Sequence, residues 1–112
     1  MKIAVRTVGD VQILDCSGKI TLGAETMSIR NTVRELLDSG TKKILLNLGE
    51  VSYIDSAGIG ELVGSYASAA KNDAHLKLLN LTNKISQLLT ITKLMTVFET
   101  FDNEQTAVAS FQ

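Results

Sequence analysis

The sequence predicts an α/β fold: one small domain over residues 1–112, with a mixed sheet of four to five strands, parallel in its second half, and about four helices packed mainly on one face. Its length and its 45% of hydrophobic residues allow about two-thirds of the surface to be buried, so the core needs no disulfide. Short apolar runs alternate with longer runs of helical periodicity, in the order β-β-α-β-α-β-α-β-α. Strand-helix-strand units of this kind favour parallel pairing through right-handed crossovers.

The N-terminal residues predict a hairpin. Residues 3–8 and 11–16 are two strand-like runs, and Gly9–Asp10 between them is a tight-turn signal. A loop is expected over residues 18–23. Cys16 is the only cysteine of the chain, which excludes an internal disulfide. Its place in an apolar run favours a small buried residue over a redox role.

A helical pattern begins at Ala24 and ends at Ser39–Gly40, because glycine accepts the left-handed conformation that stops a helix. Four apolar residues share the inward face of this helix: Ile29, Val33, Leu36 and Leu37. Charged residues take the other face, which predicts a solvent-exposed surface.

The centre of the chain predicts a buried strand followed by a second helix. Residues 43–48 are apolar at nearly every position, which is typical of a central parallel strand covered on both faces. After a loop, one apolar stripe of the helix is expected to face the sheet: Ile59, Leu62, Val63, Tyr66, Ala67 and Ala70. The opposite face presents Ala57, Gly60, Glu61, Gly64, Ser65 and Ser68. Interior glycines cost about 1 kcal/mol each relative to alanine, so this face serves something other than helix stability.

The next strand is expected over residues 75–81, after Asn72–Asp73 closes the second helix. Thr82 or Asn83 then caps a third helix. Both residues carry a side-chain oxygen that can accept from the first turn.

The C-terminal residues predict a short strand and a last helix. Val97–Phe98 has the apolar character of a short strand. Asp102 and Gln105 have the spacing of a capping box, which indicates the start of a helix there. Val108 and Phe111 are expected to anchor that helix to the core.

Composition excludes several classes of function. The net charge is −1, with 11 basic and 12 acidic residues mixed along the chain, so no basic face indicates nucleic acid. No apolar run reaches the length of a membrane span, and Met1–Ala4 leads directly into a strand pattern without a signal peptide. We therefore expect a cytoplasmic protein that does not bind membranes. The carboxylates are dispersed without ligand spacing, so neither a metal nor a cofactor is expected.

Ser56 stands at the head of the second helix, in the run Asp55-Ser56-Ala57-Gly58. Both Asp55 and Ser56 are good N-cap residues, so a capping role is the simplest explanation of the serine. A cap, however, does not require the small residues beside it, whereas a hydroxyl that another protein must approach closely does. A helix N-terminus also stabilises negative charge, so the fold would tolerate a phosphate on Ser56.

The sequence does not predict an enzyme. A nucleophilic serine needs a base within hydrogen-bond reach, and the only histidine is His75. In the predicted topology Ser56 follows the C-terminal end of its strand and His75 opens the next strand at the opposite edge, about 20 Å away. The motif also lacks the Gly-x-Ser-x-Gly pattern of a nucleophile elbow.

The segment 51–60, VSYIDSAGIG, preceded by ILLNL at residues 44–48, resembles the signature of the STAS-domain anti-sigma factor antagonists of bacteria, and the resemblance extends over essentially the whole chain. It implies that Ser56 is phosphorylated by a partner anti-sigma factor that is also a serine kinase using ATP and magnesium. In that family the unmodified antagonist sequesters the kinase and frees the sigma factor. A metal-dependent serine phosphatase reverses the modification.

The resemblance also implies a partner-binding surface: Thr21, Asp55, Ser56, Ala57, Gly58, Gly60, Glu61 and Gly64. The sequence departs from the family at Thr21, where many members carry an aspartate in the early loop. That loop often contributes to the kinase interface, so the departure bears on which partner is bound.

Two alternatives stay open. The chain could be a STAS module that does not switch, built into a larger regulatory assembly of the stressosome type or into a lipid-transport assembly, with Ser56 only capping its helix. A small hydrolase is the third reading, and it predicts that a serine-reactive phosphonate labels Ser56. The sequence also leaves a weak homodimer open.

Overall fold

The computed structural model describes residues 1–21 and 27–112, without the side chains of residues 27 and 28. Within that part of the chain the elements are β1 (Lys2–Val8), β2 (Val11–Ile20), α1 (Met27–Asp38), β3 (Lys43–Ile54), α2 (Ser56–Lys71), β4 (His75–Leu79), α3 (Asn83–Ile91), β5 (Thr100–Phe101) and α4 (Glu104–Ala109). They form one five-stranded sheet in the order β1-β2-β3-β4-β5. Only the β1–β2 pair is antiparallel, so the predicted mixed sheet with a parallel second half is confirmed.

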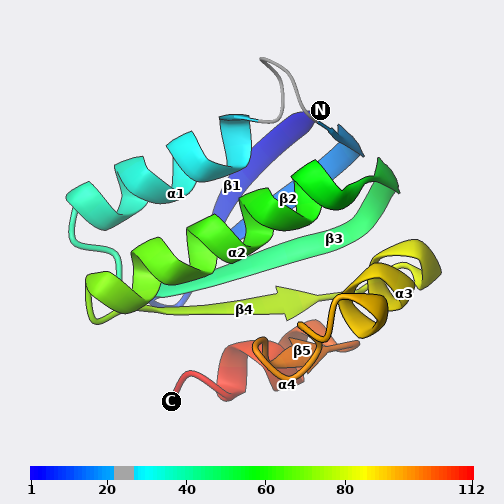
Figure 1. The fold of residues 1–112 in the computed structure, drawn as a ribbon. Coiled ribbons are helices and arrows are strands. Elements are labelled where there is room, and N and C mark those ends of the chain that lie inside the picture. Colours follow the sequence, from blue (N-terminus) through cyan, green and yellow to red (C-terminus); the bar gives the residue numbers. More distant parts are fainter. Residues whose placement is uncertain (22–26) are drawn as a thin grey trace.

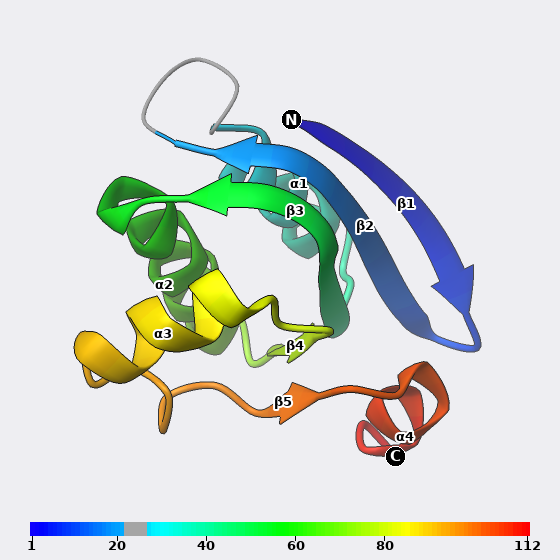
Figure 2. The ribbon, with the colours of Figure 1, turned by 90° about the vertical axis from the view of Figure 1, so that its right-hand side faces the viewer.

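The helices cover the two faces of the sheet unequally. Helices α1, α2 and α3 lie on one face and α4 lies on the other, as Figures 1 and 2 show. Alternate residues of β3 serve the two sides: Leu46 packs into the large core under α1–α3, and Leu45 packs into a smaller core under α4. This arrangement confirms that the helices pack mainly on one face.

Two strands are longer than the sequence predicts. Strand β2 continues to Ile20, so the loop expected from residue 18 is wrong up to that point, and residues 22–23 lie outside the described part. Strand β3 continues from the predicted end at residue 48 to Ile54. The two extensions pair with each other, ending at Ile20 opposite Ile54. Polar residues of the extensions face solvent, so no continuous apolar run marks these strands.

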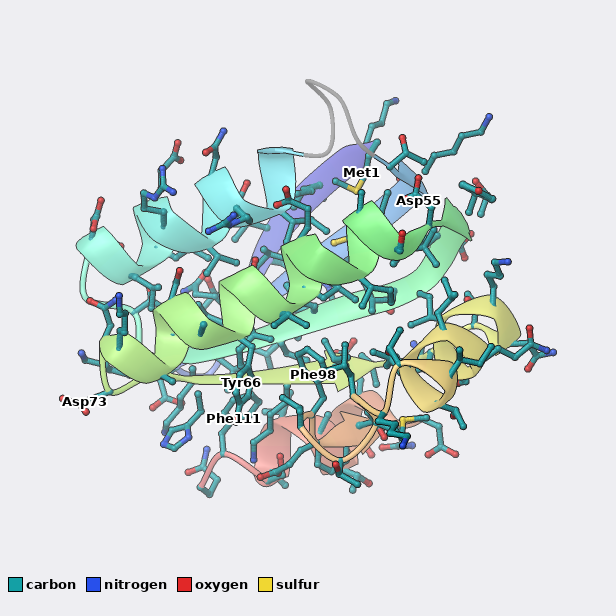
Figure 3. All side chains as sticks on the ribbon, in the orientation of Figure 1. Met1, Asp55, Tyr66, Asp73, Phe98 and Phe111 are labelled. Carbon is teal, nitrogen blue, oxygen red and sulfur yellow. The ribbon has the colours of Figure 1, made fainter. Side chains whose placement is uncertain are left out.

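The C-terminal elements also differ in detail. The last strand is β5 and not Val97–Phe98, because Phe98 turns into the core and packs edge-to-face on Tyr66, with ring centroids 5.3 Å apart (Figure 3). Strand β4 ends at Leu79, two residues earlier than predicted. Helix α4 is capped by Asn103, whose Oδ1 accepts from the Thr106 N–H at 2.9 Å, so the predicted cap at Asp102 is wrong.

The other helix ends agree with the prediction where the structure describes them. Thr82, one of the two candidates, caps α3, and Asn72 closes α2. Helix α1 begins at Met27, and the predicted start at Ala24 lies outside the described residues.

Two basic residues hold α4 to the sheet. Arg6 of β1 donates through Nε to Asp15 at 2.6 Å and through Nη1 to Glu104 at 3.0 Å. These bonds lower the pKa of both carboxyls below their usual range. Lys77 of β4, 8% exposed, donates to the Ser110 carbonyl oxygen at 3.0 Å. A helix of six residues thus gains electrostatic contacts that its small apolar face does not supply.

Cys16 is 1% exposed, and burial raises the pKa of its thiol to about 12. A thiol with this pKa is neutral and unreactive at physiological pH. The prediction of a small buried residue is confirmed.

Candidate functional site

Ser56 lies at the junction of β3 and α2, at the C-terminal edge of the parallel strands. Asp55 is the N-cap of α2, with φ −119° and ψ −174°, and its Oδ1 accepts from the Gly58 N–H at 2.9 Å. Ser56 is the first residue of the helix and is exposed. The cap is therefore supplied by its neighbour, and the simplest explanation of Ser56 as the N-cap is wrong.

The end of β2 fixes the position of this junction. The Asp55 N–H donates to the Ile20 carbonyl oxygen at 3.4 Å, and Ile54 beside it is fully buried. Figure 3 labels Asp55 at the end of the molecule where α2 begins. Thr21, half-buried, directly follows Ile20, so it lies at the same edge of the sheet as Ser56.

Gly58 lies where α2 packs closely against the end of β2. A Cβ on Gly58 would lie 2.3 Å from the Ile20 carbonyl oxygen and 2.7 Å from Cγ1 of Ile54. Cβ atoms are not found so close to atoms to which they are not bonded. Only glycine therefore lets α2 approach β2 this closely. The resemblance implied that Gly58 belongs to the partner-binding surface; it is buried instead, so that expectation is wrong.

Gly60 and Gly64 lie on the outer side of α2 in different surroundings. A Cβ on Gly60 would meet no atom of residues 1–21 or 27–112 within 4 Å, so the helix surface there is open to the described part of the chain. A Cβ on Gly64 would lie 3.0 Å from both Cζ and Nε of Arg30, which reaches across from α1. The absence of a side chain at residue 64 thus makes room for a residue of the same chain.

Glu61 and Ser65 carry the two buried side-chain oxygens that have no hydrogen-bond partner within the described residues. Glu61 Oε2 has Arg30 Nε as its nearest cation, at 3.9 Å. Ser65 is 1% exposed, although we predicted it on the open face.

Helix α2 faces the sheet with part of the predicted stripe: Ile59 and Leu62 are buried, and Val63 and Tyr66 pack against the core. Its buried residues are Gly58, Ile59, Leu62, Ser65 and Ala69. Ala67 and Ala70, which we predicted to face the sheet, are exposed.

Ser56 and His75 lie at opposite ends of the parallel strands. His75 pairs with Lys43 at the beginning of β3, whereas Ser56 follows the end of that strand of 12 residues. The two side chains therefore cannot form a catalytic pair. Within residues 1–21 and 27–112, no three His, Cys, Asp or Glu side chains gather as a metal ion would require.

None of the helices in the described part combines the length and the apolar character needed to cross a membrane.

Three further residues near the site were not predicted from the sequence. Tyr53 is 44% exposed at the end of β3, and an exposed aromatic residue three positions before Ser56 was a usable signal. Arg30 and Arg34 lie on the exposed side of α1 and line a hollow together with Glu61. In sequence they are indistinguishable from any solvated helix face.

Comparison with known proteins gives a consistent result. Residues 2–107 match the family model described as STAS domain. An "Anti-sigma-B factor antagonist" of Staphylococcus aureus (strain NCTC 8325) is 35% identical over 66 residues, which are 59% of this chain and 61% of that protein. The aligned part thus spans less than two thirds of this relative's length.

Solved structures share the fold. An anti-sigma factor antagonist from Mycobacterium paratuberculosis superposes with a TM-score of 0.85 at 15% identity, over 97% of this chain and 92% of that one. The Bacillus cell fate determinant SpoIIAA in its phosphorylated form superposes with a TM-score of 0.77 at 17% identity, over 99% and 100%. These identities show likeness of fold, and the family model covers nearly the whole chain. The chain therefore belongs to the STAS domain family.

Proposed function

We propose that this chain is an anti-sigma factor antagonist: a binding protein, not an enzyme, that is switched by phosphorylation of Ser56. Without phosphate it binds an anti-sigma factor that is also a serine kinase, and this binding releases a sigma factor. One observation carries the proposal: Ser56 is exposed at the first turn of α2 although Asp55 already caps that helix. The likeness to proteins named anti-sigma-B factor antagonist supports it.

The position of Ser56 suits a reversible phosphate. The first turn of a helix has unpaired N–H groups and a partial positive charge, so an anion there is stabilised by about 0.3–1 kcal/mol. Asp55 uses Oδ1 to accept from Gly58, and the fold does not depend on the Ser56 hydroxyl for its cap. Phosphorylation would therefore leave the folded state intact.

Phosphate on Ser56 would weaken the binding of the partner, although it would leave the fold intact. Phosphate adds close to two negative charges at the centre of a surface that fits a neutral hydroxyl. Leaving a charge buried and unpaired in the interface costs about 3–5 kcal/mol, which corresponds to about two to three and a half decades in affinity. Binding would thus switch without refolding.

The remaining partners follow from this assignment. The kinase binds the ATP and Mg²⁺, so the chain itself needs no cofactor, and a metal-dependent serine phosphatase restores the hydroxyl. The partner surface we propose comprises the exposed or half-buried residues of the predicted set: Thr21, Asp55, Ser56, Ala57, Gly60, Glu61 and Gly64. We place the protein in the cytoplasm as a single domain over residues 1–112, with neither nucleic acid nor membrane as its target.

Affinity measurements with charge variants test the switch. The partner is sought among the products of the neighbouring genes as a protein of the anti-sigma factor kinase class, and its dissociation constant is measured by calorimetry. Ser56→Asp should weaken binding by at least tenfold, whereas Ser56→Ala should bind like the wild type. Ser68→Asp makes the same change farther along α2 and serves as the matched control. Equal affinity of Ser56→Asp and wild type would contradict the charge mechanism.

Incubation with kinase and ATP followed by intact-mass analysis tests the modification itself. We expect the mass of one phosphate on the wild type and none on Ser56→Ala. An unmodified wild type would favour the alternative of a non-switching STAS module in a regulatory or lipid-transport assembly.

A further inference from the structure

A hollow of about 140 Å³ lies between α1 and α2. Arg30, Asn31, Arg34 and Glu61 line it, and we refer to it as the α1–α2 hollow. Figure 1 shows the two helices side by side over the sheet, so the residues that line the hollow belong to the same helical layer as the first turn of α2.

The charges of the α1–α2 hollow do not balance. Arg30 lies near Glu61, with Nε 3.9 Å from Oε2, and Glu61 turns that oxygen away from solvent. Arg34 is exposed and has no carboxylate within 4.0 Å among the described residues. The hollow therefore carries an excess positive charge on a chain whose overall charge is −1.

The groups that face solvent in the hollow are mainly hydrogen-bond donors. Two guanidinium groups and the amide of Asn31, which is also exposed, surround it. Guanidinium groups present paired N–H donors whose geometry matches a carboxylate. Arg30 keeps 46% of its side chain exposed even though its guanidinium lies over Gly64.

The hollow lies on the same helix as Ser56, because Glu61 of α2 lines it. Glu61 directly follows Gly60, whose surroundings are open, and Arg30 covers the helix one turn farther along at Gly64. The rise of an α-helix places Gly60 about 6 Å and Gly64 about 12 Å along the axis from Ser56. A protein that covers Ser56 and Gly60 would therefore reach the hollow within one standard interface.

We propose that the α1–α2 hollow is a second contact of the partner protein and receives an acidic side chain of the anti-sigma factor, with Arg34 as the main ligand of its carboxylate and Arg30 beside it. This inference rests on the proposed function and extends the interface from α2 to α1. It also gives Gly64 a role: the missing side chain seats the Arg30 guanidinium at the edge of the interface.

Charge reversal at Arg34 tests the inference with the same candidate kinase and wild-type chain. Arg34→Glu should weaken binding at low salt by about tenfold, mainly through slower association, and should reduce its dependence on salt. Lys71→Glu changes the net charge equally at the far end of α2 and should bind like the wild type. Thermal melts verify that both variants fold, and Arg34→Gln, with an intermediate loss of affinity, replaces Arg34→Glu if that variant unfolds.

The outcomes separate the two proposals. Wild-type binding together with unchanged affinity of the Arg34 variant overturns the second contact and leaves the proposed function standing. An equal loss for Lys71→Glu also overturns it, because net charge rather than this site would then steer association. If the wild type binds no anti-sigma factor, the proposed function fails and the second contact falls with it.

Discussion

The two sides of helix α2 contain the same small residues for different physical reasons. On the buried side, Gly58 lies against β2 so closely that no other residue fits. On the outer side, Gly60 has open space around it, and none of the described residues requires a glycine there. A glycine forced by internal packing reports on the fold, whereas a glycine that the fold does not need indicates an external constraint. Substitutions along α2 therefore separate residues that build the domain from residues that serve a partner.

Gly58→Ala should give the largest effect. The added Cβ would lie 2.3 Å from the Ile20 carbonyl oxygen, and backbone at the end of β2 cannot move aside as a flexible side chain can. We expect a loss of about 3 kcal/mol in the free energy of unfolding, since overpacking outweighs the gain in helix propensity. Urea unfolding followed by circular dichroism measures it. A loss below about 1 kcal/mol would show that α2 and β2 separate easily and would remove the contrast with Gly60.

Gly60→Ala should have the opposite effect on stability. Because its Cβ meets nothing within 4 Å, the variant should gain about 1 kcal/mol in the free energy of unfolding. Its affinity for the proposed partner should nevertheless fall, since the new methyl group holds the two surfaces apart. The control is Ala70→Gly at the exposed far end of α2, which should lose about 1 kcal/mol of stability and keep the partner affinity. A Gly60→Ala variant that binds as tightly as the wild type would place this glycine outside the interface.

The effect of Gly64→Ala on the free energy of unfolding should lie between the effects of the substitutions at Gly58 and Gly60. Helix propensity favours alanine by about 1 kcal/mol, but the Arg30 guanidinium 3.0 Å from the new Cβ must move, so we expect almost no net change. In an Arg30→Ala background the same substitution should recover the full gain. A double-mutant cycle on unfolding free energies measures the coupling, expected to be on the order of 1 kcal/mol. Purely additive effects would mean that Arg30 does not occupy this place.

Much of the fold was predictable because strong local signals agreed with the final packing. Residues 43–48 could be assigned to the sheet centre since a continuous apolar run suits a strand covered on both faces. The continuation of β3 to Ile54 could not, because its outward residues are polar and its stability comes from pairing with β2. That pairing depends on tertiary structure, which a local pattern does not contain.

The candidate site was predictable in its position and less so in its surroundings. The place of Ser56 after a buried strand and at a helix start follows from local patterns alone. The orientation of α2 does not, because a helix rich in alanine, glycine and serine gives a weak apolar stripe: Ser65 is buried and Ala67 exposed. The contact of Arg30 with Gly64 joins two helices far apart in the sequence, so only the packed structure reveals it.

Ser65→Ala should give a small gain in stability and tests the orientation of α2 directly. Ser65 is 1% exposed and its Oγ has no hydrogen-bond partner within the described residues. Removing an unpaired buried hydroxyl costs no hydrogen bond, and alanine is the better helix former by about 0.5 kcal/mol. We therefore expect the free energy of unfolding to rise by about that amount, measured by urea unfolding with Ser68→Ala on the half-exposed side as the control. A loss of more than about 1 kcal/mol in Ser65→Ala alone would mean that the hydroxyl is bonded and that α2 packs differently against its neighbours.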